Sequence, residues 1–299
     1  MQKVLIIYNP SSGSKNGTDF GNKLNDILQQ KNITTSLYAT TGYDDFKQLI
    51  SDHMDDGFDT VAALGGDGTA SQIANAIATF ETRPNILLIP TGTTNNLARA
   101  LGIDLNVDKF LTEIAQEHLQ PKVIDIGKIN DEYFVSTVSV GSIPEIAWKA
   151  NEEHKEKFGS LGYVLDSFQA LNEEKTFDVD LKVDGREQSF KDVALMIIGI
   201  SNSVFGVQTF FKEAEIDDGY LHLYLLKQGD LLTKMGTVVK DVLPNQMNKS
   251  DDNSYTMKFK EADIASNLAL NFAIDGDKGP KMPVKIEILH NHLTFYTTE

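Results

Sequence analysis

The stretch LGGDGTASQIANAI, residues 64–77, combines three glycines, an acid and a threonine in a spacing that could bind a phosphate. Glycines leave room for a ligand close to the backbone and permit backbone angles that other residues avoid. An apolar run precedes them and an amphipathic pattern follows, so a strand ends and a helix begins here. The unpaired N–H groups at a helix start favour an anion. The stretch therefore predicts a phosphate-binding turn, with Thr69 capping the helix.

Asp67 places a carboxylate within this turn, where it would repel a phosphate. The repulsion is removed if a Mg²⁺ ion or its water lies between the two groups. A simpler alternative is an ordinary glycine turn with a capping threonine, because glycine pairs are common at turns. The full GGDGT sequence between a strand and a helix is much narrower than a loose glycine pattern. We therefore favour the phosphate-binding interpretation.

Two further polar loops follow predicted strands. YNPSSGSKNG at 8–17 offers backbone N–H groups in a Ser/Gly stretch that could wrap an anion. IPTGTTNNLARAL at 89–101 offers neutral donors and acceptors, and its Asn95 could cap the next helix. Each loop alone reads as ordinary surface. Because ligands of open parallel sheets bind at the carboxyl ends of the strands, the loops together predict one site.

A second candidate for chemistry is AIDGD at 273–277. Apolar residues alternate before it, as in a half-buried strand. The strand breaks at Gly276, so we expect it to project the carboxylates of Asp275 and Asp277 from its end. The alternative is an Asp-Gly turn between two strands, which is a strong hairpin signal.

These residues must be positioned by the elements around them, and the first 120 or so residues alternate strand and helix patterns. Unbroken apolar strands alternating with helices indicate a parallel sheet covered on both faces. The predicted strands are 3–9, 34–40, 59–66 and 85–92, and the predicted helices are 22–31, 44–54, 70–80, 96–103 and 107–118.

After about Val123 short strands and turns dominate, which suggests an antiparallel sandwich or barrel-like second domain. Hairpin turns are expected at Asn130-Asp131 and Asp184-Gly185, and a third around Asn291, between two histidines. Residues 144–174 read as a helical insert.

Composition excludes several classes of function. The chain of 299 residues is 41% hydrophobic with 8 prolines, as in a packed globular protein. Its net charge of −16 disfavours nucleic-acid binding and strong adhesion to anionic lipid. Cysteine is absent, and the longest apolar run, 193–200, is far shorter than the roughly 20 residues of a membrane span. No signal peptide is evident. We expect a cytoplasmic protein.

NPSSG, GGDGT, PTGTTNNLAR and AIDGD, in this order over nearly the whole chain, resemble the soluble diacylglycerol kinase-type lipid kinases, a superfamily that includes sphingosine and ceramide kinases. GGDGT alone is shared with NAD kinases. The resemblance implies an α/β plus β fold with ATP between two domains. A doubly wound α/β nucleotide-binding domain would span 1–123 and be rejoined by 290–299, and a β-sandwich-like lipid-substrate domain would span 124–289.

The resemblance also implies roles for individual residues. Asp275 would be the general base, accepting the proton of a lipid hydroxyl that attacks the γ-phosphorus of ATP. Asp67 would help to hold the metal. The implied nucleotide-binding residues are Asn9, Thr41, Gly65, Gly66, Asp67, Gly68, Thr69, Ala70, Ser71, Thr93, Asn95 and Asp277. A structural Mg²⁺ would bind Asp218, the carbonyl of Tyr220 and Glu215, and the alternative there is a plain turn before a strand.

The implied function is an ATP- and Mg²⁺-dependent lipid kinase of phospholipid biosynthesis that converts diacylglycerol to phosphatidic acid. It would touch the membrane surface transiently, and a homodimer is left open. Two residues depart from the family pattern: Asn96 replaces an aspartate, and Asp277 replaces a glutamate. NAD kinase and an inactive nucleotide-binding regulator are the alternatives, the latter because of Asn96. Asp275→Asn is expected to abolish turnover at little loss of stability.

Overall fold

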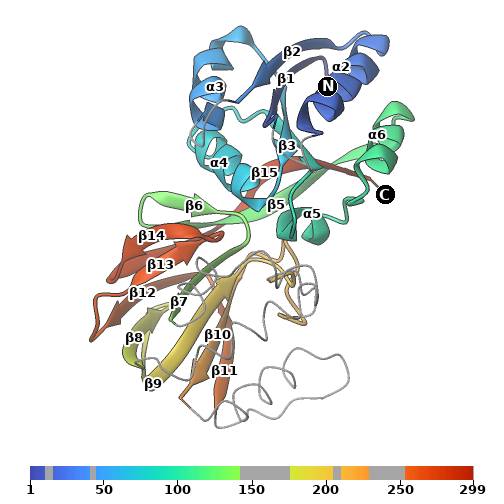
Figure 1. Ribbon diagram of the computed structural model, residues 1–299. Helices are drawn as coiled ribbons and strands as arrows, with labels where there is room; N and C mark the ends of the chain where they lie inside the picture. The colour runs from blue at the N-terminus through green and yellow to red at the C-terminus, as the bar shows by residue number, and fades with distance from the viewer. Residues whose placement is uncertain (11–15, 41–44, 142–175, 205–209, 229–252, 299) are drawn as a thin grey trace. The chain divides into compact units, whose positions relative to one another are not determined.

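The computed structural model describes residues 1–10, 16–40, 45–141, 176–204, 210–228 and 253–298 (Figure 1). The predicted insert at 144–174 lies outside these residues. The chain divides into two compact units: Met1–Ile126 with Asn291–Glu299, and Gly127–His290. Each unit is described by itself. No helix in the described residues is long and apolar enough to cross a membrane.

The first unit is built on a parallel sheet of strands with continuous apolar sequences. Its strand order is β2-β1-β3-β4, with the end of β15 beside β4. Apolar residues fill the middle of β1, β3 and β4, because both faces of a parallel sheet are buried. The bounds are β1 Lys3–Tyr8, β2 Thr34–Ala39, β3 Thr60–Gly65, β4 Asn85–Pro90 and β15 Val284–Thr298.

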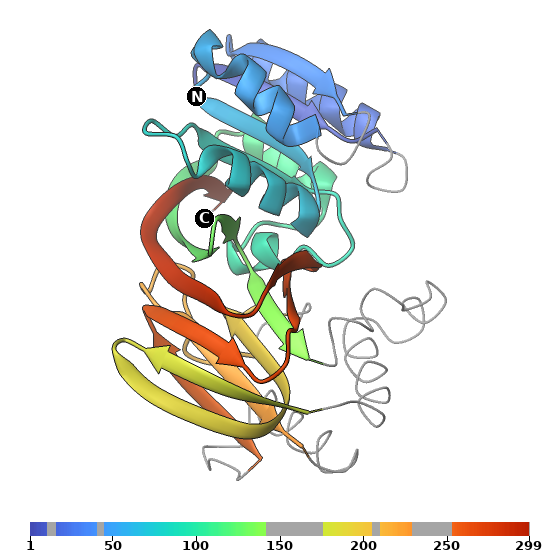
Figure 2. The same cartoon turned by 90° about the vertical axis from the view of Figure 1, so that its left-hand side faces the viewer.

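Helices cover both faces of this sheet, as Figures 1 and 2 show. Helices α2 and α6 pack together on one face, and α3 and α4 on the other. The helix bounds are α2 Gly17–Gln30, α3 Asp45–His53, η1 Met54–Asp56, α4 Asp67–Ile77, α5 Asn96–Ala100 and α6 Val107–Ala115. The predicted doubly wound α/β arrangement is confirmed.

The second unit is an antiparallel sheet with one continuous apolar core. Its strand order is β14-β13-β7-β9-β8-β12-β15, and β10 joins β9 to β11. The predicted turns at Asn130-Asp131 and Asp184-Gly185 connect β5 to β6 and β8 to β9. The bounds are β5 Leu119–Ile129, β6 Glu132–Phe134, β7 Thr137–Gly141, β8 Phe177–Val183, β9 Arg186–Gly199, β10 Leu221–Lys227, β11 Ser254–Phe259, β12 Glu261–Ser266, β13 Asn271–Ile274 and β14 Asp277–Lys281.

The hairpin expected around Asn291 is wrong, because β15 continues through it. Asn291 has a left-handed φ of 52°, and its N–H donates to Asp125 Oδ1 at 2.7 Å. The positive φ makes one local irregularity rather than a reversal, since β15 pairs with β12 before this point and with β4 after it. The last residues of the chain therefore complete the first unit.

His292, on β15, predicts a pH dependence of stability. Its Nε2 lies 3.0 Å from the carbonyl oxygen of Ala78, just after α4. Burial lowers the pKa of His292 below its usual value; the contact with the Ala78 carbonyl opposes this, and the charge of Arg83 lowers the pKa further. Because the pKa of His292 is lower in the folded than in the unfolded protein, neutral His292 favours the folded state. This contribution to stability is present above about pH 6.5 and is lost as the pH falls through the folded pKa.

The test is urea unfolding at pH 7.5 and 5.5, comparing wild type with His292→Gln, whose amide can still donate to Ala78. We expect the loss of stability on acidification to be smaller in the variant by about 0.5 kcal/mol, since solvent screens a half-exposed ring. An equal loss in both proteins would contradict this role for His292.

Candidate functional site

Three of the predicted loops leave one edge of the parallel sheet in the first unit. Asn9 follows Tyr8, which is paired with Leu64, and Gly65 is paired with Pro90. The loops after β1, β3 and β4 therefore begin side by side. Thr41, predicted for the fourth loop, lies outside the described residues.

The two glycine loops after β3 and β4 are in direct backbone contact. A Cβ added at Gly92 would lie 2.4 Å from Gly66 Cα, and one added at Gly66 would lie 2.9 Å from Gly92 Cα. Neither position can therefore carry a side chain without a backbone shift. Asn95 braces the contact: its Nδ2 donates to the Gly92 carbonyl at 2.8 Å, and its Oδ1 accepts from the Gly92 N–H at 3.1 Å.

Asp67 links the same two loops from the other side. Its Oδ1 accepts a hydrogen bond from the N–H of Leu97 at 3.3 Å, so the start of α4 is tied to the start of α5. Burial raises the pKa of the Asp67 carboxyl, while backbone N–H groups of Leu97, Asn96 and Asn95 and the charge of Arg99 oppose that rise. The carboxylate thus holds the second loop against the first.

The structure corrects both capping expectations. Helix α4 begins at Asp67, before Thr69, and its N-cap Gly66 has no side-chain hydrogen bond. Thr69 instead packs against Gly65, where an added Cβ would lie 2.0 Å from Thr69 Oγ1. Asn95 is the N-cap of α5 but adopts a left-handed φ of 53°, and its carboxamide bonds to Gly92 rather than to the helix. The first turn of α4 therefore has no side chain closing its N-cap.

Thr91 is a site residue that the sequence analysis missed. It lies between the last residue of β4 and Gly92, it is 9% exposed, and its Oγ1 has no hydrogen-bond partner. A buried hydroxyl without a partner is rare in a native protein. The available signal was its position, since it is the first polar residue after a buried strand.

The remaining predicted residues of this unit differ in exposure. Ala70 and Ser71 are buried on α4. Gly68 has open space where a Cβ would be. Thr93 is exposed in the second loop, and Asn9 is exposed after β1.

Asp275 lies in a two-residue hairpin between β13 and β14. Asp275 and Gly276 have φ values of 49° and 99°, and Ile274 pairs with Asp277. This is the Asp-Gly turn considered as the alternative. The carboxylate of Asp275 does not project away from the strand, however, but folds back on the segment before β7.

Three backbone N–H groups fix the orientation of the Asp275 carboxylate. Oδ1 accepts from Ser136 and Thr137, each at 2.9 Å, and Oδ2 accepts from Val135 at 3.0 Å. The Asp275 N–H donates to the Thr137 carbonyl at 2.8 Å. Asp277 is exposed at the start of β14. The turn thus holds one oriented and one exposed carboxylate.

The turn predicted to bind a structural metal is closed by other contacts. Asp218 Oδ2 lies 2.9 Å from His222 Nε2, and Oδ1 accepts from the Tyr220 N–H at 2.9 Å. The Glu215 backbone N–H donates to Asp218 Oδ2 at 3.4 Å. No group of three or more acidic or histidine side chains in the described residues could hold a metal. The metal expected at Asp218, Glu215 and the Tyr220 carbonyl stays a prediction, and His222 is already in contact with one Asp218 oxygen.

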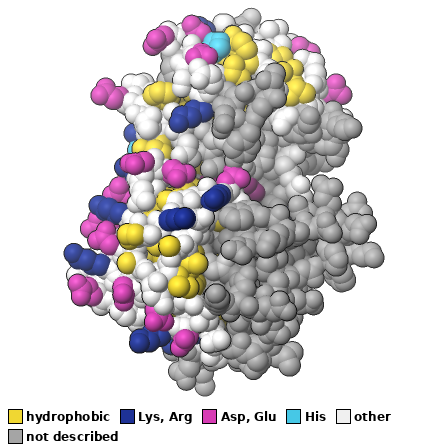
Figure 3. Space-filling model, turned by 60° about the vertical axis from the view of Figure 1, so that its left-hand side comes forward, with side chains coloured by type: hydrophobic (Ala, Val, Ile, Leu, Met, Phe, Trp, Pro, Cys, Tyr) yellow, Lys and Arg dark blue, Asp and Glu magenta, His cyan; other side chains and the backbone are white. Residues whose placement is uncertain are grey.

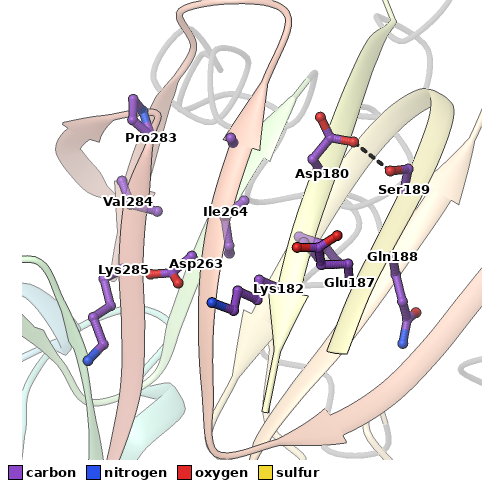
Figure 4. Close-up of a pocket in the computed structure, with 12 residues that line it drawn as sticks. Asp180, Lys182, Glu187, Gln188, Ser189, Asp263, Ile264, Pro283, Val284 and Lys285 are labelled. Carbon is purple, nitrogen blue, oxygen red and sulfur yellow. Dashed lines mark hydrogen bonds between the residues drawn. The ribbon is translucent and has the colours of Figure 1, made fainter. Parts of the chain in front are cut away.

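A hollow of about 490 Å³ lies on the antiparallel sheet of the second unit (Figure 4). Side chains of β8, β9, β12 and β15 line it, among them Lys182, Glu187, Asp263 and Lys285. None of the predicted site residues is in its lining. Size alone therefore does not mark the candidate site here.

Comparison with known proteins finds related sequences over nearly the whole chain. Residues 3–129 match the family model of the diacylglycerol kinase catalytic domain. A diacylglycerol kinase of Staphylococcus saprophyticus is 28% identical over 300 residues, covering 99% of this chain and 95% of that protein. A diacylglycerol kinase of Staphylococcus aureus is 29% identical over 299 residues, covering 99% and 92%.

Solved structures share the fold. The crystal structure of a diacylglycerol kinase from Bacillus anthracis has a TM-score of 0.81 at 24% identity, covering 98% of this chain and 96% of that one. A second crystal structure from the same organism has a TM-score of 0.85 at 24% identity. The Staphylococcus relatives are diacylglycerol kinases, so they argue against the NAD kinase alternative. Residues 3–129 match the diacylglycerol kinase catalytic domain and nearly the whole chain is similar to diacylglycerol kinases, which together support a lipid kinase.

Proposed function

We propose that the protein transfers the γ-phosphoryl group of ATP to the free hydroxyl of diacylglycerol, giving phosphatidic acid and ADP. The hydroxyl oxygen forms the new bond to phosphorus as the bond to the β–γ bridging oxygen breaks, and the hydroxyl proton passes to Asp275. The observation that carries the proposal is the pair of glycine loops joined by Asp67 and Asn95 at the carboxyl ends of β3 and β4. The names of the curated relatives support the acceptor.

Three features fit the phosphates of a nucleotide. The start of α4 has no side-chain cap at Gly66, so its first N–H groups suit an anion. Open space at Gly68 allows a ligand to approach the backbone. The buried hydroxyl of Thr91 has no partner in the protein. The proposed nucleotide contacts therefore add Thr91 to Asn9, Thr93 and the residues of the GGDGT loop, and Asp277 stays a separate prediction.

In this proposal Asp67 holds the loops after β3 and β4 together. Its carboxylate is also the group of the GGDGT loop that could bind a cation. When bound, Mg²⁺ neutralises charge on the phosphates. Catalysis then depends mainly on how well the loops position the reacting groups. The structural metal expected at Asp218 stays a separate prediction, and His222 would share that carboxylate with it.

Contact with the bilayer is expected to be transient. On the face shown in Figure 3, Lys and Arg side chains are interspersed with Asp and Glu over the described residues. The whole chain carries a net charge of −16. Such a surface has little attraction for anionic headgroups, so recognition must come from the acceptor lipid itself.

The test is transfer of labelled phosphate from γ-labelled ATP to acceptors in mixed micelles: diacylglycerol, monoacylglycerol, phosphatidylglycerol, undecaprenol and sphingosine, with NAD tested in plain buffer. We expect diacylglycerol to be labelled in the presence of Mg²⁺ and labelling to stop when EDTA removes the metal. Label on another lipid would overturn only the assignment of diacylglycerol as the acceptor. Label on NAD alone, or nucleotide binding with no acceptor labelled, would overturn the proposed function.

A further inference from the structure

Two buried serines in the second unit have hydroxyl groups without a hydrogen-bond partner. Ser136 is 4% exposed and Ser203 is 0% exposed, and neither Oγ is paired. Leaving a buried hydroxyl unpaired is unfavourable, and native proteins contain few such groups. Both hydroxyls therefore suit a partner that does not belong to the protein.

Both serines lie at the end of the sheet that holds Asp275. The Ser136 N–H donates to Asp275 Oδ1 at 2.9 Å, and the Ser136 carbonyl accepts from the Ile200 N–H at 3.2 Å. Ser203 follows Ile200 by three residues, just beyond β9, and its N–H donates to Ser201 Oγ at 3.3 Å. Both serines therefore lie close to the end of the β7–β9 ladder, and Ser136 itself anchors the proposed base.

Aromatic side chains lie next to the same strand end. Phe211 packs over Gly199, where an added Cβ would lie 2.8 Å from its ring. Phe210 meets the edges of Phe211 and Tyr224, with ring centroids 5.1 Å and 5.3 Å apart. The Phe210 N–H donates to the Asn202 carbonyl at 3.2 Å, which keeps these rings beside Ser203. Polar groups and an apolar wall together suit an amphipathic ligand.

We propose that Ser136 and Ser203 bind the glycerol ester oxygens of the acceptor lipid and so hold its hydroxyl at Asp275, with Phe210 against an acyl chain. This rests on the proposed function and names its headgroup site. Uncharged hydroxyls match an uncharged ester, to which each serine can donate a hydrogen bond. Both Oγ atoms are covered in the ligand-free protein, so binding entails a local shift around them.

The experiment compares Ser136→Ala and Ser203→Ala with wild type in the micelle assay. We expect each variant to raise KM for diacylglycerol about three- to tenfold, the worth of one neutral hydrogen bond. KM for ATP should not change, and Tm should not fall, because the lost hydroxyl had no partner in the free protein. The matched control is Ser189→Ala on β9, whose Oγ already donates to Asp180 Oδ1 at 2.6 Å and whose loss should leave both KM values unchanged.

A dialkylglycerol, which has ether links and no ester carbonyl, identifies the group that is bound. We expect its KM to exceed that of diacylglycerol in wild type, and the difference to shrink in both variants. Unchanged KM values in the variants, or a lower Tm with an unchanged KM, would overturn the headgroup site and leave the proposed function standing. A wild type that phosphorylates neither lipid overturns the proposed function, and this inference with it.

Discussion

Asp275→Asn is expected to lower kcat by about 10²- to 10⁴-fold, the usual contribution of a general base. An amide cannot accept the proton of the lipid hydroxyl. The measurement is the initial rate of phosphatidic acid formation at saturating ATP, Mg²⁺ and lipid, made at a temperature where the variant is folded. Turnover at the wild-type rate would show that Asp275 is not the base.

The structure changes the expectation that this variant keeps its stability. The Asp275 carboxylate accepts N–H groups on both oxygens, from Ser136 and Thr137 on one and from Val135 on the other. An amide offers a single acceptor oxygen, so its NH₂ group would face an N–H group of the backbone. Leaving a buried donor unpaired destabilises a protein by about 1–3 kcal/mol. Urea unfolding should therefore show a loss of this size.

Asp184→Asn is the matched control. Asp184 also precedes a glycine in a two-residue hairpin, with a φ of 46°. Its Oδ1 accepts from the N–H groups of Lys260 and Glu261, at 3.1 Å each. We expect this variant to keep both its stability and the wild-type kcat, because the one amide oxygen can still accept from both N–H groups. A comparable fall in kcat for both variants would mean that a change at an Asp-Gly hairpin, and not lost base chemistry, explains the result at Asp275.

Gly92→Ala should damage both the stability of the first unit and its candidate site. Its Cβ would lie 2.4 Å from Gly66 Cα and 2.7 Å from Asn95 Oδ1, so the two loops must separate and Asn95 must give up its bonds to Gly92. Overpacking of this kind destabilises by about 1–3 kcal/mol. A shift of about 1 Å in a positioning loop also lowers the rate about 10²-fold. Thermal unfolding and kcat/KM for ATP measure the two effects.

Gly68→Ala is the control for Gly92→Ala, because it adds the same methyl group to a glycine loop without a steric clash. An added Cβ at Gly68 meets no atom within 4 Å, and the residue lies in α4. Helix propensity then favours alanine by up to about 1 kcal/mol, so Tm should rise slightly. If phosphates approach this backbone, KM for ATP rises although the fold is intact. A wild-type Tm for Gly92→Ala would contradict the loop contact.

The sequence by itself determined the elements and their order. Continuous apolar runs predicted β1, β3 and β4, because a strand buried on both faces has no polar side. Asp-Gly and Asn-Asp pairs predicted the two hairpin turns, because these residues tolerate a positive φ. Since the carboxyl ends of parallel strands meet at one edge, the position of the glycine loops followed from the strands alone. The family resemblance rested on the same local motifs.

Only the tertiary structure decided what the site residues touch. The Asp67 carboxylate accepts from the N–H of Leu97, and Asp275 turns back onto Ser136; both contacts join segments that lie far apart in the chain. The same holds for β15, which looked like a hairpin around Asn291 until its partners β12 and β4 were known. Local patterns report which face of an element is buried. Hydrogen-bond partners and unpaired hydroxyls, such as those of Thr91, Ser136 and Ser203, are set by packing between elements that lie far apart in the chain.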